Sequence, residues 1–148
     1  MKAVIQRVSQ AKVSLRDDQG KFCQIGKGIL VLLGIEKQDS DKEIDYILDK
    51  IINLRIFEDE NGKMNLSLLD IDGDLMLISQ FTLLADTKKG RRPSFINAGD
   101  PDQSCKIFNQ FVEKAKSKVK NVQQGWFGEY MDVKLVNEGP VTIILESK

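Results

Sequence analysis

Alternating apolar and polar positions near the amino terminus predict a long, half-exposed first strand. Residues 3–15 read AVIQRVSQAKVSL, in which β-branched residues are interrupted by polar ones, and this composition favours a strand. The run GILVLLGI at 28–35 has no polar side chain, so it predicts a strand that is buried on both faces near the centre of a sheet. FCQIG at 22–26 and GDLMLISQF at 73–81 predict two further strands.

Two segments with helical spacing carry their own start signals. Ser40 begins the capping box SDKE, in which Glu43 occupies the third helical position. Its apolar stripe follows at helical spacing: Ile44, Ile47, Leu48, Ile51 and Ile52. Asp100 caps a second helix that has Pro101 at its first position. The apolar stripe of that helix is Ile107, Phe108, Phe111, Val112 and Ala115.

The rest of the chain is rich in turn signals. The Asn61-Gly62 pair between two short β-like runs predicts a hairpin. Residues 82–99 are polar, basic and longer than most connections within a domain, which indicates a functional loop. Two strand-like runs, 130–136 and 141–145, close the chain. With about seven strands and two helices, the pattern predicts an α/β fold whose mainly antiparallel, barrel-like sheet is covered by the helices.

Composition narrows the class of protein. A chain of 148 residues fits one domain, 1–148, and can bury roughly two-thirds of its unfolded surface. The 22 basic residues balance the 22 acidic ones, so a nucleic-acid contact requires a local patch. The longest apolar run is far shorter than the roughly twenty residues of a membrane span, and the amino-terminal segment lacks the apolar core of a signal peptide. We therefore expect a cytoplasmic protein without membrane contacts.

The sequence contains no histidine, which excludes His-dependent triads, Cys-His dyads and His-ligated zinc sites. Cys23 and Cys105 belong to no paired motif, so we predict two reduced, packed thiols. No cluster with convincing metal-ligand spacing is visible, and we predict no metal and no cofactor. A hydrolase built from this chain would need a carboxylate, a lysine, a metal-bound hydroxide held by oxygen ligands, or a group of its own substrate as the base.

Three motifs are candidates for chemistry. Ser79 and Gln80 follow a buried strand, where backbone amides near Gln80 and Phe81 can hold a developing oxyanion; the same residues can also simply satisfy backbone groups at a strand end. Gly139 and Pro140 interrupt the last apolar run, which indicates either a bulged edge strand or a functional site. The third motif is KKGRR, here called the basic loop, with the cations Lys88, Lys89, Arg91 and Arg92. It is either a solvated loop or a phosphate contact.

Read together, three segments make the chain resemble the D-aminoacyl-tRNA deacylase family along essentially its whole length. They are LRIFEDENGKMNLSLLD at 54–70, SQFTLLADTKKGRRPSF at 79–95 and NEGPVT at 137–142. MKAVIQRVS and GILVLLGIEKQD agree around them. Mild departures fall in the segment GWFGEYM, where the residues that replace expected polar or small ones are Trp126, Glu129 and Tyr130.

The resemblance implies hydrolysis of the ester between a D-amino acid and the 3′-terminal adenosine of tRNA. It implies a homodimer in which the Gly139-Pro140 pair of one subunit completes the active site of the other. That pair would be cis, with two carbonyls that receive the substrate ammonium and a backbone that leaves an L side chain no room. Many D-amino acids, and glycine, would then be accepted. The residues implied around the adenosine and ester are Ser79, Gln80, Phe81 and Thr82, and the basic loop would contact acceptor-stem phosphates.

Thr82 invites a nucleophile hypothesis, but the sequence shows no base to activate its hydroxyl. We expect instead that the 2′-hydroxyl of the tRNA helps to activate the attacking water, while the protein positions the ester and stabilises the oxyanion. Two alternatives remain open. One is a non-catalytic nucleic-acid-binding protein that uses the basic loop, and the other is a related deacylase with relaxed chirality that removes small L-amino acids.

Overall fold

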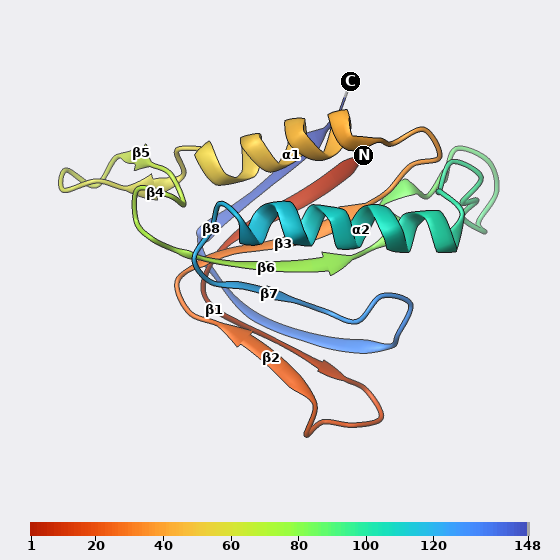
Figure 1. The fold of residues 1–148 in the computed structure, drawn as a ribbon, viewed down its shortest axis with the longest axis horizontal. Helices are drawn as coiled ribbons and strands as arrows, with labels where there is room; N and C mark the ends of the chain where they lie inside the picture. Colours follow the sequence, from red (N-terminus) through yellow and green to blue (C-terminus); the bar gives the residue numbers. More distant parts are fainter. Residues whose placement is uncertain (148) are drawn as a thin grey trace.

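A long first strand organises the sheet, as the sequence pattern predicts. The computed structural model describes residues 1–147 (Figure 1). Strand β1 (Lys2–Leu15) pairs along one edge with β8 (Met131–Glu146). Along its other edge it pairs with β3 (Gly28–Gly34) near its start and with β2 (Phe22–Ile25) near its end. All three pairings are antiparallel.

Two helical connections extend the sheet with parallel strands. Helix α1 (Asp41–Asn53) lies between β3 and β6 (Asp74–Ser79), and α2 (Pro101–Lys116) lies between β6 and β7 (Val122–Gln124). The β3–β6 and β6–β7 pairs are parallel, because a helical crossover returns the next strand in the same direction. The sheet curls into a nearly closed barrel with both helices on one face (Figure 1). The predicted fold class is therefore confirmed, and the short strand β7 is an addition to it.

Both helices begin as predicted. The Glu43 carboxylate accepts hydrogen bonds from the Ser40 amide at 2.9 Å and the Ser40 hydroxyl at 2.6 Å, which closes the capping box. The Asp100 carboxylate accepts from the amides of Asp102 and Gln103 at 3.0 and 3.3 Å. The apolar stripe of each helix is buried against the sheet. Local signals alone therefore determine where α1 and α2 start.

Two apolar layers lie on opposite faces of the sheet. Ile29 and Val31 of β3 face the helices, whereas Leu30 faces the inside of the curl with Met76 of β6. All four side chains are fully buried. This alternation explains why β3 is apolar at both odd and even positions.

The end of the chain differs from the prediction in one respect. The runs at 130–136 and 141–145 belong to a single strand, β8, rather than two. Its register against β1 shifts opposite Gln6 and Val8, so the segment around Gly139 bulges out of the ladder. The Gly139–Pro140 peptide bond is cis, as the family resemblance implies.

Two short elements flank the main sheet. The predicted hairpin at Asn61-Gly62 forms from β4 (Phe57–Glu58) and β5 (Met64–Leu66), which pair with each other in a separate sheet. A 3₁₀ helix, η1 (Phe81–Leu84), follows β6 directly and begins the long segment for which the sequence predicts a loop. Among the described residues, no helix is long and apolar enough to cross a membrane.

Candidate active site

An apolar cavity opens beside the end of β6 and the first turn of α2. Its volume is about 380 Å³, within the range of small-molecule sites. Three aromatic rings, those of Phe81, Phe95 and Phe127, contribute to its lining, and Ser79 and Ser104 provide hydroxyl groups. Phe81 packs edge-to-face on Phe95 with 5.0 Å between ring centroids. A narrow space with aromatic walls and a few polar groups suits a flat heteroaromatic ring such as a purine.

The chain turns sharply at the mouth of this cavity. The Gln80 amide donates to the Leu33 carbonyl at 2.8 Å, which extends the β3–β6 pairing past Ser79. The backbone amide of Gln80, one of the oxyanion donors considered from the sequence, is therefore already occupied. The next two amides, those of Phe81 and Thr82, open η1 and have no partner within that helix. They are therefore the backbone donors of this turn that are candidates for binding an oxyanion.

The Thr82 side chain is poorly placed to act as a nucleophile. Within residues 1–147, its hydroxyl accepts a hydrogen bond of 2.5 Å from the Gln80 side-chain amide. An amide cannot remove a proton, and activation of a hydroxyl needs a neighbouring base. The geometry therefore favours a positioning role for Gln80 and Thr82.

The Gly139–Pro140 corner is exposed and is held from behind by a buried arginine. Arg7 is only 4% exposed. Its Nε donates to the Glu138 carbonyl at 3.0 Å, and its Nη1 donates to the Ile56 carbonyl at 2.6 Å. A Cβ atom added to Gly139 would lie 2.9 Å from Arg7 Nη2, and the Gly139 φ of +129° is itself unfavourable for other residues. Arg7 and Gly139 thus form one closely packed unit.

Two polar side chains brace the same corner from within β8. The side-chain oxygen Oδ1 of Asn137 accepts from the Val141 backbone amide at 2.9 Å. The Asn137 amide donates to the Thr142 hydroxyl, also at 2.9 Å. Because these bonds cross the bulge, they satisfy groups that the interrupted ladder leaves free. Asn137 and Thr142 therefore explain the polar ends of NEGPVT.

The corner and the cavity of one chain lie far apart. Gly139 bulges opposite Arg7, and Arg7 pairs across β3 at Ile29 with Leu75 of β6. Three strand spacings, together with the four residues from Leu75 to Ser79, separate the two features by roughly 15–20 Å. The corner and the cavity of one chain are therefore two separate features rather than parts of one pocket.

The basic loop is exposed and leads into the cavity wall. Asp86 and Ser94 pair through two backbone hydrogen bonds of 2.7 and 3.0 Å, which close the loop at its base. Phe95, immediately after Ser94, lines the cavity. None of the four loop cations forms an ion pair within residues 1–147. By contrast, Lys114 on α2 is paired with Asp41 and Asp45.

Sequence reasoning overlooked several of these residues. Arg7 follows Ala3 and Ile5 at alternate positions of β1, so a charge on the buried face of a predicted strand was the available signal. Phe95 and Phe127 gave no such signal, because their approach to Ser79 depends on the sheet order. A larger groove of about 580 Å³ along β1 and β8 contains none of the motif residues. Among residues 1–147, no group of three or more His, Cys, Asp or Glu side chains is placed to hold a metal ion.

Comparisons with known proteins identify the family of this chain. The family model described as D-Tyr-tRNA(Tyr) deacylase matches residues 4–146. A D-aminoacyl-tRNA deacylase of Clostridioides difficile (strain 630) is 54% identical over 147 residues, which cover 99% of this chain and 97% of that protein. One of Kosmotoga olearia is 55% identical over 149 residues, covering 100% of this chain and 98% of that protein.

Two solved structures are also similar. The c-Myc DNA Unwinding Element Binding Protein superposes with a TM-score of 0.93 at 42% identity, covering 100% of this chain and 99% of that one. A probable eukaryotic D-amino acid tRNA deacylase superposes with a TM-score of 0.83 at 17% identity and 97% coverage of both chains, which shows a shared fold.

The fold and these relatives define a hydrolase of the deacylase class. The chain belongs to the D-Tyr-tRNA(Tyr) deacylase family.

Proposed function

We propose that this chain hydrolyses D-aminoacyl-tRNA and releases the free D-amino acid and tRNA, as a step of translation quality control in the cytoplasm. The observation that carries the proposal is a purine-sized aromatic cavity lined by Ser79 and Phe81, next to the start of η1, where the amides of Phe81 and Thr82 have no partner within that helix. The adenine of the terminal adenosine occupies the cavity. The ester carbonyl then lies at these amides, which stabilise the oxyanion as it develops.

The base in this reaction comes from the substrate. Ser79, Gln80, Phe81 and Thr82 position the adenosine and the ester. The 2′-hydroxyl next to the ester helps to activate the attacking water. Positioning of this kind can lower the barrier by several kcal/mol, on the order of 7–11 in the best intramolecular cases.

Chirality is selected by the corner of a second subunit. The separation of the corner from the cavity within one chain, roughly 15–20 Å by strand geometry, supports completion of each site across a homodimer. Strand β8 supports it as well, because among the described residues it pairs only with β1 and it exposes Val133, Val136 and Ile144 on the two sides of the corner. The Gly139-Pro140 backbone receives the ammonium group and excludes L side chains, so D-amino acids and glycine are accepted.

The basic loop binds the acceptor-stem phosphates. Its four exposed cations are free of ion pairs within residues 1–147, whereas α2 lysines such as Lys114 and Lys116 are neutralised by carboxylates. Unpaired cations attract phosphate at lower cost, because no existing pair must be broken.

The test is hydrolysis of D-Tyr-tRNA by purified protein, with L-Tyr-tRNA and Gly-tRNA as parallel substrates. We expect release of D-tyrosine and glycine and negligible release of L-tyrosine. Absence of D-tyrosine release would refute the proposed reaction, and comparable release of L-tyrosine would indicate a deacylase with relaxed chirality.

Completion of the site across subunits has its own test. Phe81→Ala damages the cavity and Gly139→Ala damages the corner, so each variant alone should be nearly inactive. Subunit exchange in an equal mixture produces heterodimers with one intact composite site, which should restore about a quarter of wild-type activity. If the mixture stays inactive although exchange is demonstrated, the cross-subunit arrangement is wrong.

A second candidate function is binding of DNA without catalysis. It is favoured by the 42% identity to the c-Myc DNA Unwinding Element Binding Protein. The basic loop would supply the phosphate contacts in that case. Binding of duplex DNA at physiological salt by a protein that leaves D-Tyr-tRNA intact would support this candidate over the deacylase.

A further inference from the structure

The turn between β7 and β8 joins the cavity to an exposed aromatic surface. Phe127 and Gly128 of this turn line the cavity. The turn is held in place by two hydrogen bonds, from the Gly125 amide to the Leu77 carbonyl at 2.9 Å and from the Glu129 amide to the Trp126 carbonyl at 3.3 Å. Its remaining large side chains, Trp126 and Tyr130, have no role in the proposed reaction.

Tyr130 is the most exposed aromatic residue of this surface, at 73%. The Arg16 guanidinium lies 4.9 Å from the centroid of its ring. The Arg16 amide also donates to the Tyr130 carbonyl at 2.9 Å, so the two residues are fixed to each other. A ring that is held by a cation and remains largely exposed offers a π face to a ligand.

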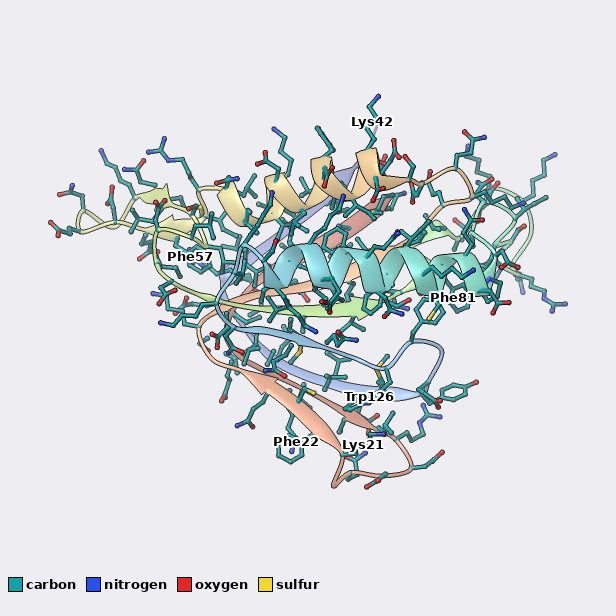
Figure 2. The ribbon with its side chains drawn as sticks, in the orientation of Figure 1. Lys21, Phe22, Lys42, Phe57, Phe81 and Trp126 are labelled. Atoms are coloured by element: carbon teal, nitrogen blue, oxygen red, sulfur yellow. The ribbon has the colours of Figure 1, made fainter. Side chains whose placement is uncertain are left out.

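The surface continues to the tip of the β1–β2 hairpin. The Lys21 ammonium lies 5.6 Å from the centroid of the Trp126 ring. Figure 2 shows Phe81, Trp126 and Lys21 one after another, from the start of α2 down to this hairpin. Trp126 itself packs against the inner core layer, whereas Phe81 and Tyr130 are exposed. Exposed aromatic rings beside a cavity are typical of single-stranded nucleic-acid paths.

Carboxylates outnumber cations on this surface. Arg16 and Lys21 are accompanied by four carboxylates of the hairpin tip, the turn and the start of β8: Asp17, Asp18, Glu129 and Asp132. Phosphates are therefore not attracted here by net charge. Recognition at this surface must come from stacking on the rings rather than from ion pairs.

We propose that Tyr130 is a stacking platform for the unpaired nucleotides that immediately precede the terminal adenosine of the bound tRNA. The inference rests on the proposed function, which places that adenosine in the cavity. Tyr130 is two residues beyond Gly128, so it lies within about 7 Å of the cavity wall along the chain. Arg16 positions the ring, and the basic loop holds the stem through charge.

The test compares RNA hairpins that carry a 5′ label and that either have or lack a single-stranded 3′ end. For wild-type protein, the single-stranded end should tighten binding. Tyr130→Ala should lower the affinity for the hairpin with that end about tenfold. It should leave the affinity for the blunt hairpin unchanged. Tyr130→Phe retains the ring and should bind as wild type does. The salt dependence of binding should be the same in all three proteins.

Kinetics give a second readout. Tyr130→Ala should lower kcat/KM about tenfold for D-Tyr-tRNA and leave hydrolysis of 3′-O-D-tyrosyl-adenosine unchanged, because the minimal substrate has no preceding nucleotide. Tyr46→Ala is the matched control. Tyr46 is likewise an exposed tyrosine beside a cation: it is 42% exposed on α1, and the Lys50 ammonium lies 5.8 Å from its ring centroid. Tyr46 does not line the cavity, so its loss should change the hydrolysis of neither substrate.

The outcomes separate this inference from the reaction it rests on. Equal loss on both substrates would show that Tyr130 merely supports the cavity, and no loss of affinity for the single-stranded end would also overturn the inference. A reduced salt dependence of binding in Tyr130→Ala would indicate that the Tyr130 region contacts a phosphate, and the stacking role would then be wrong. If wild-type protein hydrolyses neither substrate but Tyr130→Ala still loses affinity for the single-stranded end, the proposed reaction fails and the nucleotide platform stands.

Discussion

Replacing Arg7 should cost both stability and chiral selectivity. Arg7→Met keeps most of the aliphatic volume but removes the donors to the Glu138 and Ile56 carbonyls. A hydrogen bond from a charged donor contributes about 1.5–3 kcal/mol, so the two together stabilise the fold by about 3–6 kcal/mol. This is a large part of a typical stability of about 5–15 kcal/mol. The variant should therefore fold at low temperature with a much lower unfolding midpoint.

Selectivity should fall because the corner loses its support. Gly139 packs directly against Arg7, and a corner that can shift no longer excludes an L side chain. We expect the ratio of D-Tyr-tRNA to L-Tyr-tRNA hydrolysis to drop at least tenfold, which corresponds to about 1.4 kcal/mol. Urea unfolding followed by the fluorescence of Trp126, the single tryptophan, gives the stability, and the two tRNA substrates give the ratio.

Leu48→Ala separates the two effects. Leu48 is fully buried on α1, and its truncation should destabilise by about 2–5 kcal/mol without touching the corner. That variant should keep the wild-type preference for D-Tyr-tRNA. If Arg7→Met also keeps it at equal loss of stability, Arg7 is an ordinary core residue and the reasoning about the corner is refuted.

Three further predictions concern the base, the tRNA contact and acid stability. Thr82→Ala should remain active. A substrate with a 2′-deoxy terminal adenosine should be cleaved at least about a hundredfold more slowly than the normal substrate. A Thr82→Ala protein that is folded but inactive would instead indicate that Thr82 is the nucleophile. Replacing the four cations of the basic loop by glutamine should weaken tRNA binding. The slope of log affinity against log salt concentration should become shallower by about one for each phosphate that the loop no longer neutralises. The ratio of D-Tyr-tRNA to L-Tyr-tRNA hydrolysis should stay unchanged. The same change at the ion-paired Lys116 and Lys120 is the control, and an unaltered slope in the loop variant would place the tRNA elsewhere. Hydrogen bonds from the Ser67 amide and hydroxyl lower the pKa of Asp70, so its contribution to stability is present above its unfolded pKa of about 4 and is lost as the pH falls further. Wild-type unfolding midpoints should therefore fall more steeply than those of Asp70→Asn between about pH 5 and about pH 2, and parallel curves would contradict this assignment.

Local features of the fold were predictable because they depend on neighbours in the sequence. The caps at Ser40 and Asp100, the alternation of β1 and the Asn61-Gly62 hairpin are each decided by residues within a few positions. The single strand β8 was harder, because Gly139 and Pro140 break the pattern locally and only pairing with β1 on both sides of the bulge continues the strand. The short β7 likewise exists through its pairing with β6.

The sequence by itself determined the two helices, most of the strands, the fold class and the motifs that mark this family. Only the tertiary structure decided that Phe95 and Phe127 reach Ser79, that Arg7 lies behind Gly139, and that the corner stands apart from the cavity of its own chain. The physical reason is that propensities, caps and periodicities act over a few residues. The approach of distant side chains is instead decided by strand order and register, to which the whole buried core contributes.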